Sequence, residues 1–249
     1  MELHEFFRLH PKAAIAFSGG VDSAYLLYAA LACGAQVRAY YVKSAFQPRF
    51  ELEDARRVAE LLHADMTVVE ADVLDCPQIA ANTPERCYHC KRRIFAAIAE
   101  RAAKDGFETL LDGTNATDEY ADRPGMRALA ELAVLSPLRL CGISKDEVRR
   151  LSRQAGLFTW NKPAYACLAT RIATGEAITP DKLERTERAE EFMSSLGFTD
   201  FRVRMAGDMA KLQVPAPQLE AVLERRRDIL RELKQYYGAV ALDLEVRDE

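Results

Sequence analysis

The chain has 249 residues, of which 49% are hydrophobic and 29% are charged, and its formal net charge is −4. These values are typical of a globular protein with one large domain, or with a large and a small one. No run of lysine and arginine stands out, which argues against a broad face for duplex DNA or tRNA. The acidic N-terminal segment is unlike a signal peptide, and no apolar run approaches the ~18 residues of a membrane helix. We therefore expect a cytoplasmic protein that neither enters a membrane nor binds nucleic acid.

Strands and helices alternate over about the first 155 residues. Short apolar runs predict strands at 12–17, 36–42, 66–69 and 109–112. Apolar residues at helical spacing predict helices from Val21 to a stop at Gly34, and at 51–63, 92–104 and 144–155. This alternation predicts an α/β fold with a doubly wound parallel sheet, whose ligands bind at the carboxyl ends of the strands.

The pattern changes after about residue 161. Thr179 as N-cap and Pro180 at the first helical position predict a helix over 180–196. Segments 201–205 and 211–214 resemble an antiparallel pair, which a helix over 218–236 and a strand over 239–246 follow. We expect a smaller α+β domain here and place the boundary between residues 165 and 166.

The sequence SGGVDS occupies the turn between the first strand and the first long helix. A glycine-rich turn at this place lets backbone N–H groups converge on an anion, and the helix N-terminus adds partial positive charge. It lacks the Gly-Lys-Ser/Thr ending of a Walker A motif and the Gly-x-Gly-x-x-Gly spacing. We predict a phosphate-binding loop in which Asp22 fixes the loop or helps to hold Mg²⁺. Its members are Ser18, Gly19, Gly20, Val21, Asp22 and Ser23.

Two cysteine motifs could carry chemistry. RCYHCK contains Cys87 and Cys90 at the mouth of a helix, where the helix dipole and the neighbouring Arg86 and Lys91 would favour thiolates. Zinc, redox, iron–sulfur and simple packing roles remain open for this pair. KPAYACLATRI places Cys167 near the expected domain boundary.

Further polar residues extend the candidate site. Gly113 and Asn115 of DGTN follow a strand at its carboxyl end, and Arg123 of DRPG could reach adenine or phosphate, although a polar turn would look similar. Arg202 and Arg204 alternate on one strand and so share a face, which suits a nucleotide monophosphate or a solvated surface.

Two more predicted site residues flank the second cysteine motif. Arg171 could bind a substrate phosphate or carboxylate, and Glu190, or its neighbour Glu191, could bind Mg²⁺ or act as a base. The other cysteines, Cys33, Cys76 and Cys141, have no evident partners.

These motifs together resemble the ATP pyrophosphatase (PP-loop) family, and within it the ATP-dependent sulfur transferases of the LarE type. The segments that carry the resemblance are SGGVDS, RCYHCK, DGTN with DRPG, KPAYACLATRI and FRVRMAG. The resemblance implies an adenine nucleotide alpha hydrolase-like domain over 1–165 and a substrate-binding or oligomerisation domain over 166–249. It also implies ATP and Mg²⁺, a homo-oligomer, and a small-molecule nucleotide substrate. The implied reaction is adenylation of pyridinium-3,5-biscarboxylic acid mononucleotide, then sulfur insertion, in nickel-pincer nucleotide biosynthesis.

The family resemblance leaves two sulfur sources for this reaction. Cys167 takes the position of a cysteine that gives up its own sulfur in some members, whereas other members hold a [4Fe-4S] cluster on three cysteines. We favour the cluster, on Cys87, Cys90 and Cys167, because three thiolates leave one iron open for chemistry. Zinc on the same cysteines is the main rival. The implied catalytic residues are Cys167, Cys87, Cys90, Asp22, Arg171 and Glu190.

Other functions of the same loop remain as alternatives. A tRNA thiolase shares the loop, but the chain has no basic bias and no added RNA-binding domain. An amidating synthetase would need a glutaminase, and no segment resembles one. A nucleotide-sensing module without catalysis would bind ATP and release no pyrophosphate.

Overall fold

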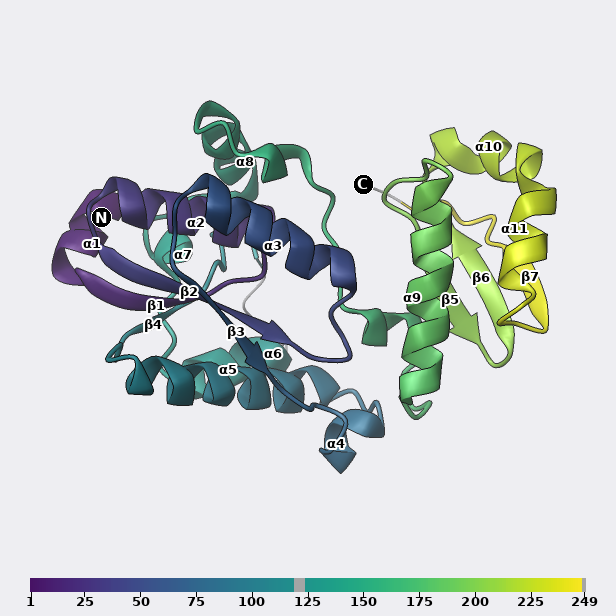
Figure 1. Ribbon diagram of the computed structural model, residues 1–249, viewed down its shortest axis with the longest axis horizontal. Helices are drawn as coiled ribbons and strands as arrows, with labels where there is room; N and C mark the ends of the chain where they lie inside the picture. Colours follow the sequence, from purple (N-terminus) through teal and green to yellow (C-terminus); the bar gives the residue numbers. More distant parts are fainter. Residues whose placement is uncertain (119–123, 248–249) are drawn as a thin grey trace. The chain divides into compact units, whose positions relative to one another are not determined.

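The computed structural model describes residues 1–118 and 124–247, and these form two compact units (Figure 1). The first unit contains Met1–Val73 and Glu85–Lys162, and the second contains Leu74–Pro84 and Pro163–Glu249. Backbone hydrogen bonds such as Ile178 N to Ala80 O, 2.8 Å, tie the short excursion to the second unit. The expected single boundary after residue 165 assigns Leu74–Pro84 to the first domain, whereas here this segment belongs to the second unit.

The first unit is built on a parallel sheet in the strand order β3-β2-β1-β4. Its strands are β1 (Lys12–Ala16), β2 (Gln36–Lys43), β3 (Met66–Glu70) and β4 (Leu110–Leu111). In β1, Ala14 pairs with Arg38 on one side and with Leu110 on the other, so β1 lies inside the sheet. The predicted doubly wound α/β fold is confirmed, with every predicted strand present at nearly its expected place.

Helices cover both faces of this sheet (Figure 1). One face carries α1 (Leu3–Leu9), α2 (Val21–Ala32), α3 (Arg49–Leu61), α7 (Pro137–Leu140) and α8 (Lys145–Gln154), with the 3₁₀ turn η1 (Phe158–Asn161) after α8. The other face carries α5 (Arg86–Lys104) and α6 (Pro124–Glu131). Side chains of β1 alternate between the two cores, because Ala13 and Ile15 join the first cluster and Ala14 joins the second.

The second unit contains a smaller sheet in the order β5-β6-β7. Strands β5 (Arg202–Ala206) and β6 (Met209–Gln213) are antiparallel, as predicted, and β7 (Ala239–Leu242) is parallel to β6. Helix α9 (Pro180–Ser195) packs beside β5, and its N-cap Thr179 accepts a hydrogen bond from the Lys182 N–H at 3.3 Å. The remaining elements are α4 (Pro77–Ala80), η2 (Leu168–Arg171), η3 (Ala216–Gln218), α10 (Leu219–Glu224) and α11 (Arg226–Leu233).

Some predicted element bounds are wrong. The continuous helix over 218–236 is interrupted at Arg225, whose ψ of 4° separates α10 from α11 without any glycine or proline to mark the break. Helix α5 begins at Arg86 and not at Arg92, so the Cys-x-x-Cys motif forms its first turns. The short helices α1, α4, α6 and α7 were not predicted. Among the described helices, none combines the length and hydropathy that a membrane span requires.

A buried tyrosine ties β2 to the loop between α5 and β4. The Tyr40 hydroxyl donates a hydrogen bond to Asp105 at 2.9 Å, and that carboxylate also lies 3.3 Å from Arg38 and 3.1 Å from Arg101. Tyr40 has no exposed surface. Its burial and the neighbouring Asp105 raise the pKa of Tyr40 to about 12.

We expect Tyr40→Phe to lower the free energy of unfolding by about 2 kcal/mol at pH 8, since one hydrogen bond to a carboxylate is lost. The folded protein holds the Tyr40 proton more tightly than the unfolded chain, so this stabilisation is complete below pH 10 and is lost as the pH rises towards 12. Urea unfolding at a series of pH values measures both effects. A constant difference between the two proteins up to pH 12 would contradict the role of the hydroxyl.

Candidate active site

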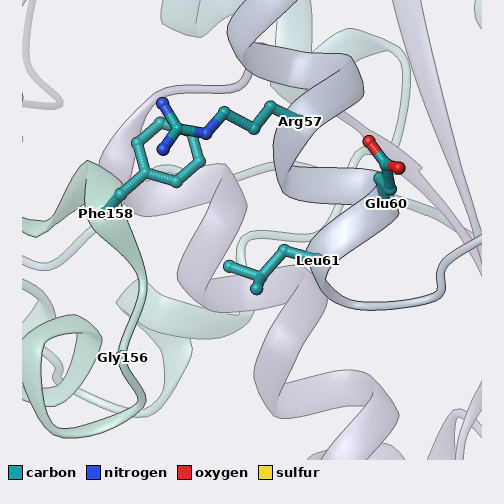
Figure 2. Close-up of a pocket in the computed structure, with 5 residues that line it drawn as sticks. All are labelled: Arg57, Glu60, Leu61, Gly156 and Phe158. Carbon is teal, nitrogen blue, oxygen red and sulfur yellow. The ribbon is translucent and has the colours of Figure 1, made fainter.

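A hollow of about 430 Å³ in the first unit lies away from the predicted site residues (Figure 2). It is lined by Arg57, whose guanidinium lies 4.2 Å from the Phe158 ring centre, and by Glu60, Leu61 and Gly156. Helix α3 runs back from β2 to the start of β3, so its C-terminal end lies at the amino ends of the strands. Nucleotide sites in such sheets lie at the carboxyl ends, which makes this hollow a poor candidate.

The SGGVDS loop lies between β1 and α2, at the carboxyl end of β1, and hydroxyl groups hold its shape. The Ser18 N–H donates to Ser23 Oγ at 3.2 Å, and the two serine hydroxyls lie 3.1 Å apart. Gly20 is the N-cap of α2, and no described side chain caps this helix. The N–H groups of the first turn of α2 are therefore available to an anion.

Two glycines allow close backbone packing around this loop. Gly19 has a φ of +72°, and a Cβ at this position would lie 2.9 Å from backbone atoms of Ala55 on α3. A Cβ on Gly113 would lie 2.9 Å from the Ser23 nitrogen. No larger residue fits at either position without moving the backbone. The loop after β4 thus packs directly on the phosphate loop.

A lysine that was not predicted reaches Asp22. Lys145 Nζ lies 2.5 Å from one Asp22 carboxylate oxygen, and Asn115 Nδ2 donates to the other at 3.3 Å. Lys145 opens α8 directly after its N-cap Ser144, which accepts a hydrogen bond from the Glu147 N–H. The capping sequence indicated where α8 begins, but only the fold shows that this end of α8 faces the phosphate loop.

The DGTN segment is ordered by its own hydrogen bonds. Asp112, which is 6% exposed, accepts hydrogen bonds from Thr114 Oγ1 at 2.5 Å and Ser136 Oγ at 2.6 Å. Asn115 is 1% exposed and accepts hydrogen bonds from both the N–H and the hydroxyl of Thr117. Arg123, the predicted adenine or phosphate contact, lies outside the described residues.

The two cysteines of RCYHCK lie on the first turns of α5. Cys87 is exposed and Cys90 is half-buried, and the Arg86 guanidinium donates to Cys87 Sγ at 3.4 Å. Residues three apart share one face of a helix, so both thiols lie on the same side of α5. Burial lowers the pKa of Lys91, the residue after Cys90. The nearby Asp112 and Cys87 act in the opposite direction and raise this pKa.

In the second unit, Arg171 and Glu190 form a buried ion pair. Their side chains are 1% and 5% exposed, and Arg171 Nε lies 2.7 Å from Glu190 Oε1. Glu190 also accepts hydrogen bonds from the Tyr165 hydroxyl at 2.6 Å and the Val203 N–H at 2.9 Å. The carboxylate is thus fully engaged in holding η2, α9 and β5 together. Its predicted part as base or Mg²⁺ ligand stays a prediction, and Glu191 is exposed.

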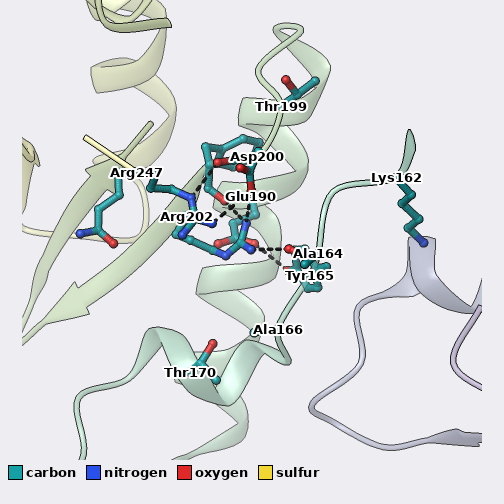
Figure 3. Close-up of polar contacts among 12 residues, drawn as sticks. Lys162, Ala164, Tyr165, Ala166, Thr170, Glu190, Thr199, Asp200, Arg202 and Arg247 are labelled. Carbon is teal, nitrogen blue, oxygen red and sulfur yellow. Dashed lines mark hydrogen bonds and ion pairs between the residues drawn. The ribbon is translucent and has the colours of Figure 1, made fainter. Parts of the chain in front are cut away.

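Arg202 extends from β5 towards Ala164 and Tyr165 (Figure 3). Arg202 donates to the Ala164 carbonyl at 2.6 Å and lies 3.5 Å from Asp200, and Arg204 donates to the Thr170 carbonyl at 2.8 Å. Burial and the nearby Arg171 and Arg247 lower the pKa of Arg202 to about 10.

The same two influences lower the pKa of Arg204. The positive charge of each guanidinium is less stable because the other guanidinium groups lie nearby. This arginine cluster, formed by Arg171, Arg202, Arg204 and Arg247, has Glu190 and Asp200 as its ion-pair partners, so an anionic ligand would find positive charge there.

The predicted site residues fall into two groups. The phosphate loop, DGTN, Cys87 and Cys90 belong to the first unit, whereas Cys167, Arg171, Glu190, Arg202 and Arg204 belong to the second. Cys167 is half-buried and is the N-cap of η2. Within residues 1–118 and 124–247, no three His, Cys, Asp or Glu side chains are grouped as a metal site.

Comparison with known proteins finds a family model and several relatives of this chain. The family model for the queuosine biosynthesis protein QueC matches residues 12–86, which contain β1, the phosphate loop and α2. A tRNA-specific 2-thiouridylase MnmA of Thermotoga petrophila is 26% identical over 193 residues, which cover 61% of this chain and 54% of that protein. An uncharacterised protein of Synechocystis sp. is 36% identical over 225 residues, 89% of this chain and 83% of that protein.

One relative with a defined activity aligns over most of the chain. The pyridinium-3,5-bisthiocarboxylic acid mononucleotide synthase of Lactiplantibacillus plantarum is 32% identical over 236 residues. The alignment covers 94% of this chain and 86% of that protein, so it includes both the phosphate loop and the arginine cluster. The chain therefore belongs to the family of pyridinium-3,5-bisthiocarboxylic acid mononucleotide synthases, the LarE-type members of the PP-loop ATP pyrophosphatases.

Proposed function

We propose that this protein is a cytoplasmic, homo-oligomeric ATP-dependent sulfur transferase. Its substrate is pyridinium-3,5-biscarboxylic acid mononucleotide, and its product is the thiocarboxylate from which the nickel-pincer nucleotide is made. The observation that carries this proposal is the open first turn of α2, held against α3 and the loop after β4 by Gly19 and Gly113. Such a turn binds the pyrophosphate part of ATP, and family membership supplies the substrate class.

In the first step, a carboxylate oxygen of the substrate attacks the α-phosphorus of ATP and pyrophosphate leaves. The N–H groups of α2 and the hydroxyls of Ser18 and Ser23 would hold the departing pyrophosphate. Once Lys145 separates from Asp22, its ammonium group would supply positive charge to the pyrophosphate. Asp22, the carboxylate of the loop, would help to hold Mg²⁺, which would supply further positive charge when bound.

The second step replaces AMP by sulfur. A sulfur nucleophile attacks the acyl carbon of the adenylate, and the bond to the AMP oxygen breaks. If the nucleophile is a sulfide, the thiocarboxylate and AMP are the products. If it is the Cys167 thiolate, a thioester forms first, and loss of the Cys167 α-proton with cleavage of its Cβ–Sγ bond then releases the thiocarboxylate and leaves dehydroalanine. Cys167 is the residue of the second unit that would act here, either directly or as a ligand of the sulfur carrier. Arg171 holds the segment around it, since its guanidinium donates to Ala166 O at 3.0 Å and to Thr170 Oγ1 at 2.7 Å.

The arginine cluster would bind the phosphate of the mononucleotide substrate. Arg202 and Arg204 lie on the same strand, and burial, together with the nearby charges of Arg171 and Arg247, lowers the pKa of both, so an anion among these groups would be stabilised. Arginine pairs are well suited to phosphate because their planar forks donate bidentate hydrogen bonds.

An iron–sulfur cluster fits the chemistry of the cysteines. Thiolates are the ligands that such clusters take, and Cys87 and Cys90 present two of them on one face of α5. Cys167 would be the third ligand. A cluster held by three cysteines supplies an open iron that can carry a transferable sulfur. Zinc on these thiolates and loss of sulfur from Cys167 itself are the alternatives.

We expect the wild-type protein to release pyrophosphate from ATP only when the dicarboxylate mononucleotide is added. Asp22→Asn should lower this rate by about 100-fold or more. Without its carboxylate, the loop loses the ion pair that positions Lys145 and the group that would help to hold Mg²⁺ in the transition state. Asp181→Asn is the matched control, since Asp181 occupies the same second helical position in α9. Unchanged release in Asp22→Asn would contradict the assignment of the loop.

Arg204→Ala should raise the KM for the mononucleotide substrate by about 10- to 100-fold, the value of a charge-assisted hydrogen bond. The KM for ATP should change less than about threefold, because the phosphate loop belongs to the other unit. Arg188→Ala, on the exposed side of α9, is the control. Equal effects on both substrates would rule out a separate phosphate site.

Iron and acid-labile sulfide should reach about four of each per chain after anaerobic reconstitution, as a [4Fe-4S] cluster requires. Cys87→Ser and Cys167→Ala should each lose them, whereas Cys33→Ser should not. If the wild-type protein binds neither, mass spectrometry after one turnover should show that Cys167 has lost one H₂S and become dehydroalanine. An unmodified Cys167 without iron would contradict both sulfur sources.

A further inference from the structure

A hollow between the starts of α5 and α6 contains a lysine that the proposed mechanism does not use. The hollow has a volume of about 360 Å³, and its lining includes Cys87, Lys91, Thr114, Asp118 and Gly125. All of these residues belong to the first unit. Thr114 follows β4 at its carboxyl end, so the hollow opens at the edge of the sheet that carries the phosphate loop.

The hollow holds the Lys91 side chain in a defined place. A Cβ on Gly125 would lie 3.0 Å from Lys91 Cδ and 3.1 Å from Cε, so the stem of the lysine packs on this glycine. Lys91 is only half exposed as a result. Its ammonium group is therefore kept in the hollow. A flexible surface lysine would extend into water instead.

The acids near Lys91 are already hydrogen-bonded by other groups. Asp112 accepts a hydrogen bond from Thr114 at 2.5 Å, and Asp118 accepts one from the Asn115 N–H at 2.9 Å. Within the described part of the chain, the Lys91 ammonium itself has no hydrogen bond or ion pair. Burial disfavours the Lys91 charge more than the nearby acids and thiols favour it, and a ligand carboxylate that hydrogen-bonds the ammonium would offset this cost.

We propose that Lys91 binds the carboxylate of the substrate that is not being adenylated, an inference that rests on the proposed function. The reacting carboxylate loses its charge when the adenylate forms, so an ion pair with it would weaken in the transition state. The other carboxylate keeps its charge throughout, and it remains an anion after conversion to a thiocarboxylate. Lys91 is thus the residue that selects a pyridinium ring with two anionic groups over a ring with one.

The test compares two substrates in three proteins. Pyrophosphate release is measured with the dicarboxylate mononucleotide and with the mononucleotide of pyridinium-3-carboxylic acid, which has a single carboxylate. Lys91→Met removes the charge and keeps a stem that fits on Gly125. Lys104→Met is the matched control, because Lys104 lies on the same helix, is exposed, and is paired with Glu100.

We expect Lys91→Met to lower kcat/KM for the dicarboxylate by about 10- to 100-fold through KM, and to leave the monocarboxylate within about threefold. Lys91→Arg should recover part of the preference, and Lys104→Met should behave as wild type. A wild-type preference that persists in Lys91→Met, or equal losses with both substrates, would overturn the inference while the proposed function stands. Wild-type protein that releases pyrophosphate with neither substrate would instead contradict the proposed function, and this inference with it.

Discussion

The phosphate loop depends on two contacts in which backbone meets backbone with no side chain between. Gly19 lies against Ala55 of α3, and Gly113 lies against Ser23 at the start of α2. A methyl group at either glycine would push the loop away and turn the first N–H groups of α2 from their common direction. These contacts also bring the loop after β4 beside α2, which is why Asn115 can reach Asp22. Anion binding here is therefore a property of packing as much as of the SGGVDS sequence.

The charges around the loop are balanced before any ligand is bound. Asp22 is paired with Lys145, and that pair is only partly exposed, at 23% and 31%. A polyphosphate would compete with Asp22 for the lysine, and a divalent cation would compete with the lysine for Asp22. Binding of ATP with its metal would therefore exchange one ion pair for two without leaving a buried charge unpaired.

The second unit follows the opposite principle, since it keeps positive charge in surplus. Glu190 is shared among Arg171, Tyr165 and the Val203 backbone, and Asp200 partners Arg202 and Arg247. These two carboxylates are shared among three guanidinium groups, those of Arg171, Arg202 and Arg247. A phosphate group would supply the missing negative charge, and the rigid Arg171–Glu190 pair would keep the arginines in place for it.

The sequence by itself determined the doubly wound sheet, the phosphate loop and the antiparallel β5–β6 pair. Each depends on local signals: period-two and helical apolar patterns, two glycines in a turn, and caps such as Thr179. It also indicated that Arg202 and Arg204 share a face, because alternation along a strand is a local rule.

Only the tertiary structure decided which distant groups meet. Lys145 contacts Asp22, which lies 123 positions earlier in the chain. Glu190 forms an ion pair with Arg171 that no spacing rule predicts. The break at Arg225 and the docking of residues 74–84 on the second unit also have no local signal. The reason is physical: side-chain partners depend on how elements pack, and packing is chosen by the burial of the whole chain, whereas turns and caps are chosen by a few neighbouring residues.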